Sequence, residues 1–254
     1  MIPRTRLFVL IVGCLVCLSM PATASAAYDW PLGGWWPMNE GRGQTIYDWS
    51  GNGNHGQLGS TAGVDANDPS WIRGRFFGSA LNFGGDDFVR IRSSKALEPE
   101  KVTVSLWFRG NGSPGTYKYL IAKGGDNCTA ASYGLETGWN GGLWFYIWNG
   151  TQQIGSGYAD PSVWDGKWHH AAGTFDGTLT KLFIDGKEVG EGSSSPAVID
   201  YSLPEEATTV GGYRGTCELL FNGDIDNVKV WNKALPIADI WRRLAELFGR
   251  PEIG

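Results

Sequence analysis

Apolar and polar residues alternate through much of the chain, which is the period-two pattern of half-buried β-strands. Residues 101–108 show it most clearly, with apolar side chains at every second position from Val102 to Phe108. Residues 142–148 are instead apolar or aromatic at six successive positions, so we expect a strand that is covered on both faces. The same patterns predict further short strands at residues 81–83, 89–91, 118–123, 132–136, 167–175, 180–184 and 187–189.

Turn signals separate these segments, and a helical period is confined to the C-terminus. Asp176-Gly177 and Asp185-Gly186 are typical of two-residue hairpin loops. Only residues 236–247 place apolar side chains at the 3.6-residue period of a helix, with Pro236 in a suitable first position. About twelve short strands with no helix between them predict an all-β fold, an antiparallel two-sheet sandwich capped by one short C-terminal helix.

The segment 219–235 changes its alternation partway along. Its apolar residues fall first in one phase and then in the other: Leu219, Phe221 and Ile225, then Val228 and Val230. Such a change indicates either a β-bulge or a central strand buried on both faces. In a regular strand Asp226 would share a face with Val228 and Val230, and Lys229 would point the other way. Because a desolvated carboxylate costs several kcal/mol unless it is compensated, we expect a partner for Asp226.

The first 26 residues have the organisation of a secretory signal peptide. Two arginines precede an apolar run over residues 7–20 that is too short to span a bilayer, and small residues follow it up to Ala26. We therefore expect cleavage after Ala26, a secreted protein, and a single domain over residues 27–254. The alternative is a bacterial lipobox ending at Cys14, which would give a lipidated N-terminus.

The charge balance limits the partners that the chain can have. It carries 21 Lys and Arg against 26 Asp and Glu, a net charge of −5, and loss of the signal arginines would make it more acidic. The absence of a basic stripe argues against binding to nucleic acid or to an anionic membrane surface. Beyond the signal, no segment is apolar for long enough to span a membrane.

The four cysteines divide between the signal and the exported chain. Cys14 and Cys17 lie in the signal, which leaves Cys128 and Cys217 in an oxidising compartment. An even pair there indicates one disulfide, and it would tie the loop at residues 124–128 to the loop at residues 213–217.

Eight short motifs, taken in their order along the chain, resemble a known family. They are Trp36-Pro-Met-Asn-Glu-Gly, Tyr47-Asp-Trp-Ser-Gly-Asn-Gly-Asn-His-Gly, Phe77-Gly-Ser-Ala-Leu-Asn-Phe, Val104-Ser-Leu-Trp, Trp168-His-His-Ala-Ala, Phe183-Ile-Asp-Gly-Lys, Phe221-Asn-Gly-Asp-Ile-Asp-Asn-Val and Asn232-Lys-Ala-Leu. Together they resemble the laminin-G-like jelly rolls of the concanavalin A-like lectin/glucanase superfamily, over about residues 30–248. The resemblance implies a jelly-roll sandwich but little about the ligand, because members of one fold differ widely in function.

The resemblance also implies a structural calcium ion. Members of this family often hold calcium between an N-terminal loop and a late Ile-Asp strand, which points to Asp48, Asn54 and Asp226 as ligands. The loop at residues 48–56 is rich in the oxygen ligands that calcium prefers. The alternative is that Asp48 and Asp226 accept hydrogen bonds from backbone N–H groups in turns.

Catalytic residues are harder to find. Asp224 and Asp226 form an i, i+2 pair of the kind that could serve a glycosidase. The glucanases of the superfamily carry a third acid, however, and position 222 is Asn here. His169 and His170 are adjacent on a strand and have neither a nucleophile elbow nor a metal-binding spacing, and we expect His170 to be a packed core residue. The sequence therefore predicts a protein that is not an enzyme.

Aromatic residues are dense between positions 139 and 164, next to the Cys128 loop. Aromatic rings can stack on sugars, and Asn or Asp can bond their hydroxyl groups, although most of these rings could instead fill the core. The ligand-binding residues that we expect are Trp139, Trp148, Asp126 and Tyr213. The interpretation is a secreted, non-catalytic module that binds a glycan or glycoconjugate. The alternatives are a polysaccharide-degrading glycosidase or lyase on the same fold, and an adhesion module that binds protein.

Overall fold

The computed structural model describes residues 31–75, 78–125, 128, 130–213, 217 and 219–246. The predicted signal peptide, its cleavage site after Ala26 and the alternative site at Cys14 lie outside these residues, as does Asp126. Among the residues described, no helix is both long and apolar enough to cross a membrane.

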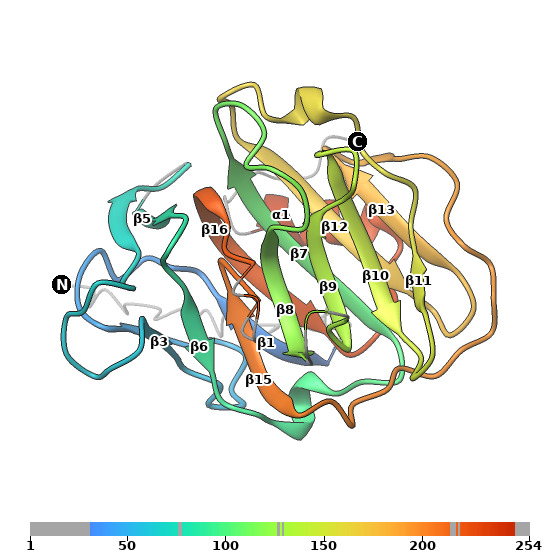
Figure 1. The fold of residues 1–254 in the computed structure, drawn as a ribbon, viewed down its shortest axis with the longest axis horizontal. Coiled ribbons are helices and arrows are strands. Elements are labelled where there is room, and N and C mark those ends of the chain that lie inside the picture. The colour runs from blue at the N-terminus through green and yellow to red at the C-terminus, as the bar shows by residue number, and fades with distance from the viewer. Residues whose placement is uncertain are drawn as a thin grey trace, which may run out of the picture.

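Two antiparallel sheets of eight strands each form the molecule (Figure 1). Sheet A has the order β14-β13-β12-β7-β16-β5-β4, with β1 also paired to β16. Its strands are β1 (Leu32–Trp36), β4 (Ser70–Arg73), β5 (Ser79–Gly84), β7 (Val102–Arg109), β12 (His169–Phe175), β13 (Thr180–Ile184), β14 (Lys187–Glu188) and β16 (Asn222–Trp231).

Sheet B has the order β11-β10-β9-β8-β15-β6-β3-β2. Its strands are β2 (Thr45–Ile46), β3 (Gly56–Leu58), β6 (Val89–Ile91), β8 (Tyr119–Gly125), β9 (Tyr133–Thr137), β10 (Leu143–Trp148), β11 (Gln153–Gly155) and β15 (Glu205–Val210). Two short 3-10 helices, Lys95–Leu97 and Pro161–Val163, lie in connections, and the α-helix α1 spans Ile237–Glu246. The predicted sandwich with one C-terminal helix is confirmed. The strands that the sequence did not indicate are mostly short ones with too few apolar residues to show an alternation.

The core fills the space between the sheets, because the alternating strands point one set of side chains inward from each. Val104, Leu106 and Phe108 of β7 face the core from sheet A, and Leu143 and Phe145 of β10 face it from sheet B. Gly173 of β12 leaves room for the Phe145 ring of the opposite sheet, since a Cβ atom at this position would lie 2.1 Å from that ring.

A β-bulge explains the change of phase in β16. The register against β7 shifts between Asp226 and Lys229, and Asn227 has a φ of 52°, in the left-handed region. The bulge keeps Ile225 and Val228 both in the core. It therefore corrects two expectations. Asp226 does not share a face with Val228. Lys229 lies on the same outer face as Asp226, because the two pair with Ser105 and Trp107, which are two residues apart in β7.

Helix α1 covers the outer face of sheet A, on the side away from sheet B (Figure 1). A second apolar cluster lies beneath it, formed by Trp107, Ala172, Phe183, Trp231, Leu235 and Ile240. The predicted capping role of the helix is confirmed.

Candidate functional site

The outer face of sheet B carries a row of aromatic side chains. Among the described residues, no helix lies over this face in Figure 1. It arises from the alternation of β10: Leu143, Phe145 and Ile147 point into the core, so Trp144 and Tyr146 point outward. Tyr119 of β8 lies on the same face. The run of six apolar or aromatic residues in β10 therefore supplies core side chains on one face of the sheet and aromatic side chains on the other.

The rings of this row follow one another from a buried end to an exposed end. Tyr213 and Tyr119 lie 5.0 Å apart between ring centroids, Tyr146 and Trp144 4.9 Å, and Trp144 and Tyr158 5.2 Å. Trp139 continues the row at 6.0 Å from Tyr158. Trp139 is 66% exposed and Tyr158 36%, so the row ends in rings that a ligand can reach. Of the predicted ligand-binding residues, Trp139 is therefore exposed, and Trp148 is half-buried against this cluster.

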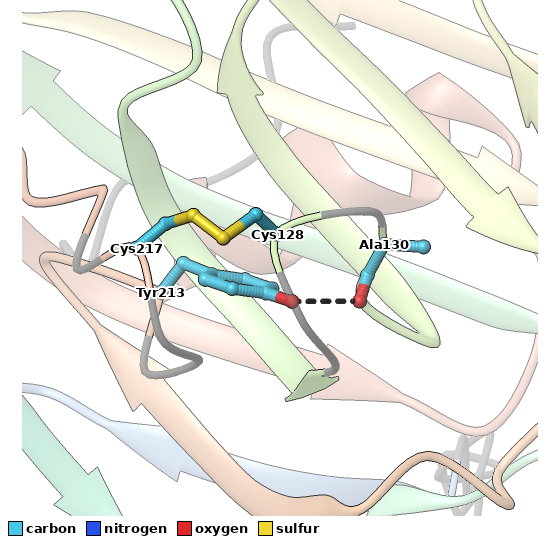
Figure 2. Close-up of a disulfide and its surroundings, with 4 residues drawn as sticks. All are labelled: Cys128, Ala130, Tyr213 and Cys217. Carbon is cyan, nitrogen blue, oxygen red and sulfur yellow. Dashed lines mark hydrogen bonds between the residues drawn. A yellow bond between two sulfur atoms is a disulfide. The ribbon is translucent and has the colours of Figure 1, made fainter.

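The predicted disulfide is present at the buried end of the row. Cys128 and Cys217 are bonded, with their Cα atoms 5.5 Å apart. Tyr213 lies beside the disulfide and donates a hydrogen bond from its hydroxyl to the carbonyl oxygen of Ala130, at 3.2 Å (Figure 2). Tyr213 is fully buried, so its side chain does not take the ligand-binding position expected for it. It instead holds the cystine-linked loops on the sheet.

A pocket of about 300 Å³ opens between the disulfide and the aromatic row. The described residues that line it are Tyr117, Tyr119, Cys128, Glu136, Gln153, Cys217 and Leu219. Tyr117 is 49% exposed at its rim, whereas Tyr119 is buried and its hydroxyl lies 2.6 Å from that of Tyr146. The pocket thus combines an accessible ring with fixed polar groups, as ligand sites commonly do.

Glu136 is the unusual group of this pocket. It is 2% exposed, and its Oε2 atom has no hydrogen-bond partner among the described residues. Burial raises the pKa of Glu136 to about 8, against the opposing effect of a hydrogen bond with Tyr119. At neutral pH the carboxyl group is therefore mostly protonated, and can both donate and accept a hydrogen bond.

The residues predicted to bind calcium are ordered by the protein itself. Both carboxylate oxygens of Asp48 accept hydrogen bonds, from the backbone N–H groups of Trp35, Ser50 and Asn54 and from the Ser50 hydroxyl, at 2.8–3.0 Å. The side chain of Asn54 donates to the carbonyl oxygen of Gly33 at 2.7 Å. This is the backbone-capping arrangement of the alternative interpretation.

Asp226 lies on the outer face of sheet A. Its Oδ2 atom accepts a hydrogen bond from the backbone N–H of Arg75 at 3.3 Å, and the Arg75 guanidinium lies 3.3 Å from the centre of the Trp107 ring. Burial raises the pKa of Asp226 to about 7. Within the described part of the chain, no group of three or more His, Cys, Asp or Glu side chains is arranged to hold a metal ion. A calcium ion at Asp48, Asn54 and Asp226 stays a prediction.

The residues considered for catalysis lie away from the pocket. Asp224 forms an ion pair with Arg109, with Oδ2 2.6 Å from Nε, and accepts a hydrogen bond from Asn82. His170 is fully buried, and burial lowers its pKa to about 3, as for a packed core histidine. Both belong to sheet A, whereas the pocket lies on sheet B.

Sequence reasoning did not identify Glu136, Tyr117 or Tyr119. One signal was present: Tyr133 and Leu135 are in one phase of β9, which places Glu136 on the opposite, outer face. The pocket beside it is also lined by Cys128 and Cys217, which come from distant parts of the sequence.

Comparisons with known proteins agree with this architecture. A family model described as the concanavalin A-like lectin/glucanases superfamily matches residues 83–240. No curated protein sequence matches the chain.

Three solved structures share the fold at low sequence identity. Domain 4 of AbnA, an extracellular arabinanase of Geobacillus stearothermophilus in complex with arabinotriose, is 19% identical with a TM-score of 0.60, over 82% of this chain and 96% of that one. The binding domain of botulinum neurotoxin DC in complex with SialylT is 16% identical with a TM-score of 0.60, over 85% and 51%. Botulinum neurotoxin type C, which interacts with two ganglioside molecules, is 17% identical with a TM-score of 0.61, over 85% and 51%. The chain thus spans about half the length of these toxin structures.

Proposed function

Because the chain belongs to the concanavalin A-like lectin/glucanase superfamily, we propose that it is a non-catalytic module that binds a glycan at the pocket on the outer face of sheet B. The single observation that carries this proposal is the pairing of exposed aromatic rings with a buried, partly unpartnered carboxyl group. Trp139, Tyr158 and Tyr117 supply the rings, and Glu136 supplies the carboxyl group.

This combination suits the two kinds of surface that a sugar has. A ring can stack on the apolar C–H face of a sugar, and an exposed Trp or Tyr keeps its own polar group in contact with water. Glu136 lines the pocket, and its Oε2 atom has no partner among the described residues, so its carboxyl group can form a hydrogen bond with one sugar hydroxyl. The arabinotriose and SialylT bound to structures of the same fold make a saccharide the ligand class to test first.

An enzyme on the same fold is the second candidate, and the raised pKa of Glu136 is the observation in its favour. An acid with such a pKa can protonate a leaving group, but most glycosidases use a pair of carboxyl groups about 5–9.5 Å apart. Of the described residues that line the pocket, only Glu136 carries a carboxyl group. We therefore favour binding, and a polysaccharide panel assayed for released reducing ends or unsaturated products would reveal turnover.

Export and a structural ion belong to the same proposal. The predicted signal peptide and the Cys128–Cys217 disulfide support export to an oxidising compartment. A structural calcium ion at the 48–56 loop would stabilise the module without contacting the glycan.

The experiment is a glycan array with the purified protein, followed by calorimetric titration of the best saccharide. Trp139→Ala and Tyr117→Ala should each weaken binding at least tenfold, because they remove exposed rings without disturbing the core. Trp49→Ala is the matched control, since Trp49 is 60% exposed but lies in the 48–56 loop. A protein that binds no saccharide on the array, or that binds one equally well without Trp139 and Tyr117, would refute the proposal.

A further inference from the structure

A second pocket, of about 380 Å³, lies at the opposite end of sheet B from the aromatic row. Figure 1 shows β3 and β6 at one end of this sheet and β10 and β11 at the other. The described residues that line the pocket are Thr45, Gly53, His55, Gly56, Gln57, Gly59, Ser60, Arg90 and Arg92. They include two arginines and no Asp or Glu, although the chain as a whole is acidic.

Strand register brings the polar side chains of this pocket together. Thr45 pairs with Gln57, and Gln57 pairs with Arg90, so the three form one row across β2, β3 and β6. Their neighbours Ile46, Leu58 and Val89 belong to the core, which places this row on the outer face of the sheet. Arg92 follows Arg90 by two residues and is exposed, as Arg90 is. Arg90 lies in β6 and Arg92 directly follows this strand, so the two guanidinium groups come from the same face of the sheet.

The neighbouring loop fixes a further donor at the rim. The Nδ1 atom of His55 accepts a hydrogen bond from the backbone N–H of Asp48 at 3.0 Å. A neutral imidazole that accepts at Nδ1 carries its hydrogen on Nε2, so His55 presents a donor on its other side. Asp48 is itself held by four hydrogen bonds, so the Asp48–Gly56 loop positions His55 rigidly.

Competition for the arginines within the protein is weak. Arg90 lies 3.4 Å from Glu205, and the two side chains are 51% and 32% exposed. Exposed ion pairs of this kind contribute little to stability, so Glu205 can be exchanged for another anion. No ion pair involves Arg92 among the described residues. The guanidinium groups can therefore form charge-assisted, two-pronged hydrogen bonds with a carboxylate or sulfate group.

We propose that the pocket formed by His55, Arg90 and Arg92 is a binding site for an anionic group, a carboxylate or a sulfate ester, of an acidic saccharide. The cross-strand row that contains Arg90 continues through Thr209, Ala122 and Gly134 to Tyr146 of the aromatic row. At a strand spacing of about 4.8 Å, Arg90 and Tyr146 are roughly 19 Å apart on this face. The inference that a saccharide carries the anionic group rests on the proposed function. The inference that this pocket binds an anion does not depend on it.

The first experiment tests the anion site by itself. Inorganic sulfate is titrated into the protein, and amide chemical shifts are followed by NMR in the wild type, in R90Q/R92Q and in R73Q. Arg73 is the control because it is an exposed arginine on β4 of the other sheet. We expect saturable shifts near Gly53, His55 and Arg90 that vanish in R90Q/R92Q and persist in R73Q. Shifts that are absent from the wild type, or unchanged in R90Q/R92Q, would overturn the site.

The second experiment identifies the carrier and the type of anion. An oligogalacturonate, a sulfated galactan oligosaccharide and a neutral galactan oligosaccharide are compared by calorimetry at two salt concentrations. An acidic oligosaccharide should bind at least tenfold more tightly than the neutral one, and R90Q/R92Q should remove that difference but not the neutral binding. The preference should also shrink at high salt, as exposed charges are screened. Equal binding of acidic and neutral oligosaccharides overturns the saccharide assignment. Sulfate binding with no oligosaccharide binding at all refutes the proposed function and leaves the anion site.

Discussion

The outer faces of both sheets carry aromatic side chains, but these are covered on sheet A and partly exposed on sheet B. On sheet A, Trp107 and Trp231 lie beneath helix α1 and are 2% exposed. On sheet B, no helix among the described residues covers the aromatic row, which runs from the buried Tyr213 to the exposed Trp139. Each face also buries a carboxyl group whose pKa is raised, Asp226 on sheet A and Glu136 on sheet B.

The difference shows that aromatic content alone does not mark a binding surface. A ring that a helix covers stabilises the fold, whereas a ring left open beside a pocket is available to a ligand. The carboxyl groups follow the same division. The Oδ2 atom of Asp226 accepts a hydrogen bond from Arg75, but Oε2 of Glu136 has no partner among the described residues and lies at a pocket.

Exchanging one tryptophan on each face for alanine tests the comparison most strongly. Trp231→Ala should lower the free energy of unfolding by about 3–5 kcal/mol, because it removes a large buried ring from the cluster under α1, and should leave the affinity for glycan unchanged. Trp139→Ala should change the free energy of unfolding by less than about 0.5 kcal/mol and weaken glycan binding. Chemical denaturation and calorimetric titration of both variants provide the measurements. If Trp231→Ala abolished binding in a protein that still folds, the two faces would not be functionally separate.

Removing the disulfide should affect both stability and binding, because it links two distant segments of the chain beside the pocket. We expect Cys128→Ser with Cys217→Ser to lower the free energy of unfolding by about 2–4 kcal/mol. Binding should also weaken, since both cysteines line the pocket. Thermal unfolding and titration of the double variant are compared with those of the wild type under non-reducing conditions. Full glycan affinity in the double variant would place the ligand away from this pocket.

Chelation tests whether the 48–56 loop needs an ion in addition to its hydrogen bonds. A calcium ion present at a hundredfold excess over its Kd would stabilise the protein by about 2.7 kcal/mol, so excess EDTA should lower the Tm by several degrees. Calcium should restore the Tm, and magnesium should do so less well. Asp48→Asn and Asp226→Asn should each remove the effect. A Tm that is insensitive to EDTA in metal-free protein would leave the hydrogen bonds of Asp48 as the full explanation.

The two buried carboxyl groups should each make the free energy of unfolding depend on pH, over different pH ranges. The unfolded chain loses the Glu136 proton near pH 4.3, but the folded protein keeps it up to about pH 8. The contribution of this group to stability is therefore greatest below about pH 4 and is lost as the pH rises towards 8.

Glu136→Gln should remove this loss, so the variant should be more stable than the wild type at pH 8, and the gain should disappear as the pH falls to about 4. Asp226→Asn should act in the same direction, with its change complete near pH 7. Denaturation between pH 4 and pH 9 gives the measurement. An identical pH profile for the wild type and Glu136→Gln would show that Glu136 is ionised in the folded protein.

The sequence by itself determined the architecture and the covalent link. The alternation in β7, β12 and β13, the apolar run of β10, the Asp-Gly hairpin turns and the period of α1 are local features, so they could be seen without the fold. The disulfide followed from the count of cysteines outside the signal. The phase change in β16 was visible too, but a bulge and a strand buried on both faces give the same pattern.

Only the tertiary structure decided which of these side chains are buried and which are exposed. The left-handed residue Asn227 settled the bulge and moved Asp226 and Lys229 to one outer face. Tyr213 and Trp139 are both aromatic residues near turns, yet packing against the disulfide buries the first and leaves the second 66% exposed. Burial and pKa depend on contacts between segments far apart in the chain, such as the loops joined by Cys128 and Cys217. Local sequence patterns do not encode those distances.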